Sequence, residues 1–555
     1  MGRLSRPGLA RFAARRMATL LRPQVELTAL PEMVKDLDVP VTVRDGTVLR
    51  VNVFRPAGAG PFPVIMSAHP YGKDRVPALS RSGRSLNLQY RLFPQPEVIR
   101  FSPWTGWEAP DPAVWTAQGY AVVNADLRGA GTSEGRCDLF SDQEAADYHD
   151  LIEWVGTQQW STGQVGLDGV SYLAISQYKV AAVHPPHLAA ICVWEGFSDI
   201  YRDWVRPGGV REDGFTFVWS KSTQRAVRTS VDLRAQIVAR PEHDDWYQER
   251  TPRLEDITVP MLVCASFSDQ SLHTRGSFEA YRRSGSAHKW LYTHRDGKWS
   301  HYYSDAATRE RIAFFDHVLK DEPNGWADRA PVSIAVHEAG PKPATHVTAD
   351  SWPPTDLSLT TLHLHQDATL QSRPDPRPGR TSFRTSKQTL AWTWTVPEDI
   401  DIIGPSALRL ALSLTGAEDL NLFVAVRKAR NGREVCFEGS YGYSLDTVTK
   451  GWQRLAHREL DSVLSTPLQP VHTHRAPEPL TPGLPTLVDV ALLPHATRMR
   501  AGEELIVELR GRWPFPRDPW RGQFPSGYQR SKKATCTVHT GADRPATLLL
   551  GTRPV

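Results

Sequence analysis

The chain has 555 residues, more than one hydrophobic core usually serves, so we expect several domains. Its hydrophobic and charged fractions, 40% and 23%, are those of an ordinary globular protein. The formal net charge of +4 is small for this length and argues against nucleic acid as a partner. No apolar run approaches the roughly 18 residues that a membrane-spanning helix needs, so we expect no membrane span.

The N-terminal segment and the cysteines bear on the compartment in which the protein works. Arginines interrupt the apolar residues of segment 1–34 every few positions, so it lacks the apolar stretch of a secretory signal. A frayed basic tail fits this segment, and so does a short amphipathic helix that docks on the protein or touches a membrane surface. The five cysteines are scattered and form no paired motif, which indicates reduced thiols. We therefore expect a cytoplasmic protein, and the sequence leaves a homodimer open.

The first half of the chain alternates strand and helix signals. Residues 48–54 alternate between apolar and polar, as in a half-exposed strand, whereas 63–68 and 120–125 are short apolar runs typical of strands covered on both faces. This alternation predicts a mostly parallel α/β sheet. The expected strands are 48–54, 63–68, 120–125, 164–169, 189–194, 260–267 and 289–293, and the expected helices are 144–158 and 172–183.

Two long insertions and a change of composition divide the chain further. The insertion at 71–115 contains arginines and aromatic residues, and the one at 196–257 is too long for a structureless loop, so we predict a helical cap there. After about residue 324 the sequence shows short alternating runs and frequent turn signals, which predict a β-sandwich. The expected parts are a basic segment (1–34), an α/β domain (35–195 and 258–330), a cap (196–257) and a β-sandwich (331–555).

Ser171 is the first candidate for chemistry. It lies between an apolar strand and a helix, where a tight turn would expose its hydroxyl above the carboxyl end of the sheet. Gly169 leaves room for such a turn, whereas Leu173 takes the place of the last glycine in the pattern G-x-S-x-G, and Ala174 follows it. A serine that merely caps a helix is the alternative interpretation.

Three motifs around this serine carry a resemblance to a known family. Asp126-Leu-Arg-Gly-Ala-Gly-Thr-Ser-Glu-Gly135 follows a core strand, Glu153-Trp154 with Gln158-Gln-Trp160 ends the next helix, and Gly169-Val-Ser-Tyr172 holds the serine. Together they resemble the cocaine esterase-like (CocE/NonD) hydrolases, which belong with X-Pro dipeptidyl peptidases and α-amino ester hydrolases. The resemblance extends over nearly the whole chain. It implies an α/β-hydrolase core with an inserted helical cap and a C-terminal all-β jelly roll resembling a galactose-binding domain.

The resemblance also implies the partners of the serine. Asp269 ends a later core strand, at the family's place for the triad acid, although Ser266 and Phe267 replace the Gly and Trp that usually precede it. Gly297-Lys-Trp-Ser-His301 is similar to the family's G-P-W-S-H, which makes His301 the expected base. The order Ser171, Asp269, His301 is that of this fold. A helix-capping Asp269 and a base at His294 are the alternatives.

An acyl transfer also needs donors for the developing oxyanion. The backbone N–H of Tyr172, directly after the nucleophile, is one expected donor. The resemblance implies the hydroxyl of Tyr71 as the second, and a packed aromatic is the alternative there. Aromatic residues of the insertions predict an apolar substrate pocket, unless they only pack the cap on the core: Trp104, Trp107, Phe217 and Trp219. Four acidic residues are candidates for holding a substrate amine: Glu108, Asp199, Asp203 and Asp213.

The sequence therefore predicts a serine hydrolase that cleaves carboxylic ester bonds, or amide bonds, of a small-molecule substrate through an acyl-enzyme. An X-Pro dipeptidyl peptidase and an α-amino ester hydrolase or acylase are the alternatives within the family. A carbohydrate-binding protein with an inactive core is the alternative from another class. We expect no cofactor and no metal, because two prolines in a turn separate His184 from His187, and the pairs His363/His365 and His472/His474 alternate along strands.

Overall fold

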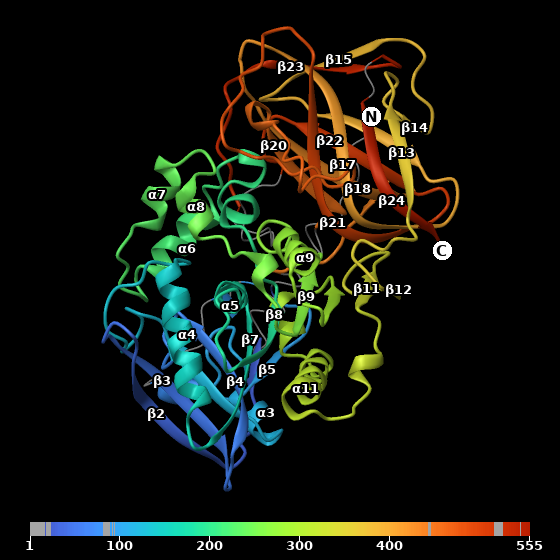
Figure 1. Cartoon of the computed structure of the whole chain (residues 1–555). Coiled ribbons are helices and arrows are strands. Elements are labelled where there is room, and N and C mark those ends of the chain that lie inside the picture. Colours follow the sequence, from blue (N-terminus) through green and yellow to red (C-terminus); the bar gives the residue numbers. More distant parts are fainter. Residues whose placement is uncertain are drawn as a thin grey trace.

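In the computed structural model, the chain folds into two parts, an α/β part and an all-β part (Figure 1). Among the described residues, no helix is long and apolar enough to span a membrane. Most of the predicted basic segment, residues 1–16 and 18–23, lies outside the described residues, and β2 already begins at Met33. The structure describes residue 17 and residues 24–80, 89–90, 93, 95–441, 446–514, 526–543 and 546–555.

The α/β part is built on one twisted sheet of ten strands, in the order β12-β11-β10-β9-β8-β7-β4-β6-β3-β2. The strands from β6 to β11 pair in parallel, and the two edges of the sheet are antiparallel. The buried apolar runs of the sequence form the central strands, which confirms the expected α/β fold. The ten strands are β2 (Met33–Thr42), β3 (Val48–Pro56), β4 (Phe62–His69), β6 (Ala121–Asp126), β7 (Ser161–Val170), β8 (Leu188–Trp194), β9 (Met261–Ser266), β10 (Lys289–His294), β11 (Val332–Val336) and β12 (Thr345–Ala349).

Helices cover both faces of this sheet and bury separate apolar clusters. One cluster contains Leu151 of α4, Leu173 of α5 and Phe278 of α9, and the other contains Trp115 of α3 and Phe315 of α11. A short ladder of β1 (Val25–Leu27) and β5 (Ile99–Phe101) lies outside the main sheet. The helices of this part are α3 (Pro112–Ala117), α4 (Asp142–Gly156), α5 (Tyr172–Ala181), α9 (Thr274–Arg283), α10 (Lys298–Tyr302) and α11 (Asp305–Lys320).

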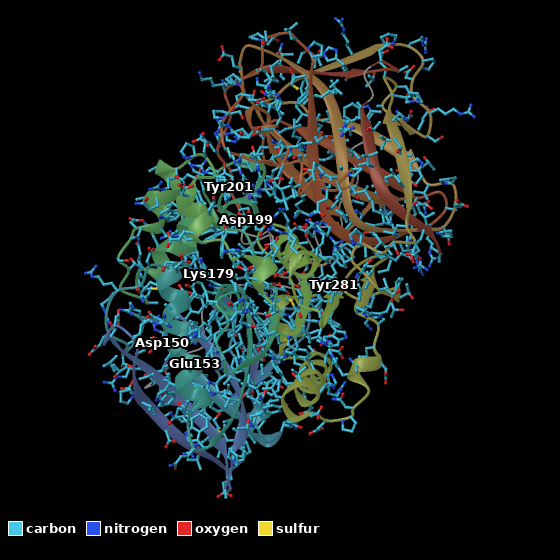
Figure 2. The ribbon with its side chains drawn as sticks, viewed as in Figure 1. Asp150, Glu153, Lys179, Asp199, Tyr201 and Tyr281 are labelled. Carbon is cyan, nitrogen blue, oxygen red and sulfur yellow. The ribbon has the colours of Figure 1, made fainter. Side chains whose placement is uncertain are left out.

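The segment between β8 and β9 is helical, as expected for a cap. It starts with a π-helical turn at Ile200–Val205 and continues with α6 (Phe215–Thr223), α7 (Leu233–Ala239) and α8 (Asp245–Glu249). Asp199 and Tyr201 lie at the start of this segment, near the all-β part (Figure 2). The guanidinium of Arg202 donates to the carbonyl of His472, so the cap contacts the all-β part.

The all-β part is an antiparallel sheet of twelve strands around one apolar core. The long strand β17 pairs with β21, β23 and β24, and a bridge between Thr369 and Thr393 brings β14 next to β16, so that the sheet nearly closes on itself. This arrangement is consistent with the expected jelly roll. The strands are β13 (Ser358–Leu364), β14 (Leu370–Gln371), β15 (Gly379–Arg384), β16 (Leu390–Thr395), β17 (Ile400–Thr415), β18 (Asn421–Arg430), β19 (Arg433–Val435), β20 (Thr449–Arg454), β21 (Thr486–Met499), β22 (Glu504–Arg510), β23 (Thr535–Thr540) and β24 (Thr547–Pro554).

The structure also differs from the expected division of the chain at the start of the β-sandwich. Residues from 331 onward were expected in the β-sandwich, but β11 pairs in parallel with β10, and β12 pairs with β11. The α/β sheet thus extends to Ala349, and the all-β sheet starts with β13 at Ser358.

Candidate active site

Ser171 stands on a strained turn between β7 and α5. Its φ of 60° and ψ of −115° lie outside the regions that a serine ordinarily adopts. Gly169, two residues earlier, has a φ of 151°, and a Cβ there would come within 2.5 Å of the Cβ of Leu173. The turn therefore needs a glycine at this position, and it leaves the side chain of Ser171 half-buried at the carboxyl end of the sheet.

The hydroxyl of Ser171 belongs to a hydrogen-bonded Ser-His-Asp array. Its Oγ lies 3.2 Å from Nε2 of His273, and Nδ1 of the same ring lies 2.5 Å from Oδ2 of Asp269. With the ring proton on Nδ1 donated to the carboxylate, Nε2 can accept the proton of the serine hydroxyl. Asp269 follows β9, and His273 stands one helical turn later, directly before α9, so a single short loop positions both groups.

The expected base, His301, is not the partner of Ser171 in this structure. It lies in α10, where its Nε2 is 3.0 Å from the hydroxyl of Tyr292 and its ring stacks on His294 at 4.0 Å. His294, the alternative, lies at the end of β10 with Nε2 3.0 Å from a carboxylate oxygen of Glu195. Both rings thus have other partners, and the array formed by Ser171 uses a different histidine.

The residue that sequence reasoning missed is His273. The motif similar to G-P-W-S-H drew attention to position 301, whereas the signal at 273 is only the spacing Asp269-Gln-Ser-Leu-His273 behind a buried strand. A histidine four residues after a strand-end aspartate can face it across one helical turn. That spacing could have made His273 a third candidate base.

A buried lysine completes the cluster around Asp269. The Nζ of Lys298 lies 2.7 Å from Oδ2 of Asp269, 3.1 Å from Nδ1 of His273 and 3.7 Å from a carboxylate oxygen of Glu195. Glu195, Asp269 and His273 offer ligand atoms within 4.8 Å of one another, which is a spacing that a metal ion could use. Lys298 already supplies the positive charge between the two carboxyl groups, so the cluster is arranged as an ion pair rather than as a metal site.

The charges of this cluster shift the pKa values of its members. Burial alone would raise the pKa of Asp269, but the charge of Lys298 and the hydrogen bonds from His273 and Lys298 outweigh it and hold the pKa below its usual value. Burial and the charge of Lys298 lower the pKa of His273 to about 4, against the opposing effect of Asp269. The ring is therefore neutral at pH 7, which is the state in which a general base accepts a proton.

The two expected oxyanion donors, Tyr71 and Tyr172, lie beside each other. Tyr172 opens α5, so its backbone N–H is among the first four of the helix, which have no acceptor within it. The ring of Tyr71 contacts the ring of Tyr172 at 6.1 Å between centroids, and its hydroxyl accepts a hydrogen bond of 3.4 Å from the indole of Trp219. Burial raises the pKa of Tyr71, so its hydroxyl keeps its proton and can donate it.

A cavity of about 460 Å³ adjoins this place, with Tyr71 in its wall. Of the four aromatic residues expected to form a pocket, Trp107 lines this cavity and Trp219 reaches Tyr71 from the cap. Trp104 instead packs on Phe54, and Phe217 is 45% exposed on the outer side of α6.

Most of the acidic residues that could bind a substrate amine form ion pairs within the protein. Arginines pair with the three that belong to the cap: Asp199 with Arg202, Asp203 with Arg275, and Asp213 with Arg211 and Arg234. Glu108 is buried and accepts a hydrogen bond of 2.9 Å from the indole of Trp299. Burial raises its pKa to about 7, so it carries less negative charge than an exposed glutamate.

Two family profiles match the sequence. Residues 45–236 match the X-Pro dipeptidyl-peptidase (S15 family), and residues 324–549 match the X-Pro dipeptidyl-peptidase C-terminal non-catalytic domain. Among curated proteins, a cocaine esterase from Rhodococcus sp. (strain MB1 Bresler) is 28% identical over 364 residues. That alignment covers 54% of this chain and 57% of the esterase, so it spans only part of each protein.

Solved structures resemble the chain over nearly its whole length. A CocE/NonD family hydrolase from Staphylococcus aureus is 33% identical, with a TM-score of 0.88, and the match covers 94% of each chain. An α-amino acid ester hydrolase has the same fold, with a TM-score of 0.68 and 18% identity over 96% of this chain and 98% of its own.

Proposed function

Because the chain belongs to the CocE/NonD family of hydrolases, we propose that it is a serine hydrolase that cleaves carboxylic esters of small molecules through an acyl-enzyme. The observation that carries this proposal is the array in which the strained Ser171 bonds to His273 and His273 bonds to Asp269. An activated serine on a strand-to-helix turn is the arrangement that acyl transfer requires.

In the proposed reaction, Oγ of Ser171 attacks the ester carbonyl while Nε2 of His273 takes its proton. Asp269 keeps the ring in the tautomer with the proton on Nδ1 and stabilises the imidazolium that forms. The backbone N–H of Tyr172 and the hydroxyl of Tyr71 donate to the oxyanion. His273 then passes the proton to the departing alkoxide, and a water molecule, activated by the same ring, releases the acid and restores Ser171.

The surroundings of the array favour a neutral substrate over one with an amino group. The cap carboxylates that could bind an ammonium group already have arginine partners, and the pKa of Glu108 is raised. The wall of the neighbouring cavity is mixed: Trp107 and Tyr90 offer aromatic surface to an apolar acyl or alkoxy group, and its carboxylate, Asp74, is paired with Lys73 at 2.7 Å. This is our reason for preferring an esterase over an X-Pro dipeptidyl peptidase or an α-amino ester hydrolase, both of which act on substrates with an amine.

The test is hydrolysis of p-nitrophenyl esters from acetate to octanoate, with phenylacetyl and aminoacyl esters and an Ala-Pro anilide, by the wild type and three variants. We expect Ser171→Ala and His273→Ala to lower kcat by roughly 10⁴-fold or more. His301→Ala is the matched control and should keep kcat close to that of the wild type. The aminoacyl ester and the anilide should be poorer substrates than the neutral esters.

The outcomes separate the alternatives. If His301→Ala is inactive and His273→Ala active, the base is the one that the sequence motif indicated and our assignment fails. Preference for the anilide would point to the dipeptidyl peptidase instead. If Ser171→Ala is as active as the wild type, Ser171 is not the nucleophile and the proposed mechanism is wrong.

We also propose a cytoplasmic location. In support, no disulfide joins any of the five cysteines, all of which lie in the described part of the chain. Fractionation of the source cells, followed by detection of the protein with an antibody, tests this point, and recovery from the extracellular fraction would contradict it.

A further inference from the structure

The proposed mechanism leaves one buried charge without a role. The ammonium group of Lys298 has no exposed surface, and its nearest partners are Oδ2 of Asp269 and Nδ1 of His273. A lysine buried so completely loses its hydration, which is costly unless charged or polar groups compensate for it. The position belongs to the loop that was similar to G-P-W-S-H, where this chain has a lysine in place of the proline.

The contacts fix what this lysine can do. Nδ1 of His273 and Nζ of Lys298 both lie within hydrogen-bond distance of the same oxygen, Oδ2 of Asp269. An ammonium group has no lone pair, so it cannot accept a proton from the ring, and both groups donate to the carboxylate. Lys298 lies at the Nδ1 side of the ring, whereas Ser171 bonds to Nε2, so the lysine acts on the serine only through the other two residues.

The charges of Lys298, Asp269 and Glu195 determine how easily His273 can be protonated. Burial would lower the pKa of Lys298, but Asp269 and the other facing groups raise it well above its usual value, so the lysine is charged. Burial raises the pKa of Glu195 well above its usual value, which favours the uncharged acid. Lys298 and Asp269 therefore form a neutral pair, and a proton added to His273 would place a second cation against one carboxylate.

We propose that Lys298 is a positioning residue of the array: it fixes the carboxylate of Asp269 and, through its permanent charge beside the ring, keeps His273 a neutral base in acidic solution. The proposal rests on the proposed function, since it assumes that His273 activates Ser171. The enzyme should therefore remain active at an acidic pH at which the catalytic histidine of an ordinary serine hydrolase is already protonated and can no longer act as a base.

The other groups around His273 do not provide this effect. The aromatic ring of Phe197 stacks on the imidazole at 6.3 Å and carries no charge. Glu108, from the loop before α3, faces Lys298 and Asp269 at longer range, and its own pKa is raised to about 7 by burial. Asp269 itself favours the protonated ring, so Lys298 is the charged group facing the ring that opposes protonation.

The experiment measures how the reactivity of Ser171 depends on pH, using the rate of labelling by a fluorophosphonate and, in parallel, kcat/KM for a p-nitrophenyl ester. We expect the wild-type rate to fall only below about pH 5, since the pKa of His273 is about 4. The fall of the rate at low pH is the acid limb of the profile. Lys298→Met should shift this acid limb to higher pH by about one pH unit or more, because the charge that opposes protonation of His273 is gone and Asp269 remains. Lys298→Arg, which keeps the charge, should leave the limb near its wild-type position.

A matched control separates this effect from loss of a buried ion pair. Lys428 is equally buried, pairs with Glu503 at 2.8 Å and belongs to the all-β part. Lys428→Met should lower Tm and leave the acid limb in place. If Lys298→Met lowers Tm without moving the limb, the lysine is only structural and the proposal fails.

The pH profile of the wild type also tests the proposal without any variant. An acid limb near pH 6.5 or above in the wild type would overturn the proposal even if Lys298→Met does not fold. Labelling needs no substrate of the enzyme, so a protein that labels at Ser171 but cleaves none of the esters still tests Lys298 while it removes the proposed esterase function. A protein that does not label at any pH overturns both.

Discussion

At the scale of single residues, the hydrogen bond of the Tyr71 hydroxyl bears on its proposed role as an oxyanion donor. The indole N–H of Trp219 can only donate, so the hydroxyl oxygen of Tyr71 accepts that bond and its own proton is directed elsewhere. We expect Tyr71→Phe to lower kcat by about a hundred- to thousand-fold, with a much smaller change in KM, because the donor acts on the oxyanion and not on the bound ester. Steady-state kinetics on one ester measure both. An unchanged kcat would leave Tyr71 as a packed aromatic, which the sequence alone could not distinguish.

The same scale shows what the sequence could predict about the site. Ser171, Asp269 and the placement of Tyr71 beside Tyr172 follow from strand ends and motifs, because a buried apolar strand with a polar residue behind it fixes the edge at which that residue appears. The choice between histidines does not follow in this way. It depends on whether the loop after β9 turns back by one helical turn, which brings His273 to Asp269, and on Tyr292 holding His301 away. The contact that decides between the histidines joins Ser171 to His273, which are 102 residues apart, and no local pattern encodes it.

At the scale of elements, α11 is tied to β7, the strand that leads to Ser171. Arg311 of α11 donates to Asp168 of β7 at 2.6 Å, both side chains are buried, and the hydroxyl of Tyr302 lies 3.1 Å from the same carboxylate. We expect Arg311→Met to lower the free energy of unfolding by about 3–5 kcal/mol, because it leaves a buried carboxylate without its cation. Urea unfolding followed by circular dichroism measures the change.

A second replacement tests the cause of that loss. Asp168→Asn combined with Arg311→Met removes both charges, so the double variant should recover part of the stability. A double variant that is as unstable as the sum of the two single variants would indicate that packing, and not the unpaired charge, is responsible.

Among the elements, the central strands and the helices beside them could be predicted to within a few residues. The expected strand 289–293 corresponds to β10 (Lys289–His294), and the expected helix 172–183 to α5 (Tyr172–Ala181). The boundary at 331 was less predictable, because β12 (Thr345–Ala349) is a short, partly exposed edge strand that resembles the strands of an all-β domain in composition. Only its pairing with β11 assigns it to the α/β sheet.

At the scale of the whole molecule, the all-β part contacts the loops that carry Asp269 and Lys298. The side chain of Gln270, next to Asp269, donates to the carbonyl of Val448 at 2.9 Å. Arg295, three residues before Lys298, donates to the carbonyls of Val448 and Thr447, and its guanidinium lies 4.2 Å from the ring centroid of Phe437. The all-β part therefore accepts hydrogen bonds from both loops, and we expect any effect of it on catalysis to be indirect.

This contact predicts a variant that is impaired in both stability and catalysis. Arg295→Met removes one donor from each of two buried carbonyls, which keep hydrogen bonds from Gln270. The cost for each carbonyl should therefore lie at the low end of the roughly 1–3 kcal/mol of a buried group that loses its partner. We expect a lower Tm, faster proteolysis between Ala349 and Ser358, where the α/β sheet ends and the all-β sheet begins, and a lower kcat because Lys298 and Asp269 are less well held. Arg329→Met is the matched control, since Arg329 pairs with Glu310 on the surface of the α/β part and should affect none of the three. If Arg295→Met lowers Tm but leaves kcat and proteolysis unchanged, the two parts contribute to catalysis independently, and the alignment of the array depends on the α/β part alone.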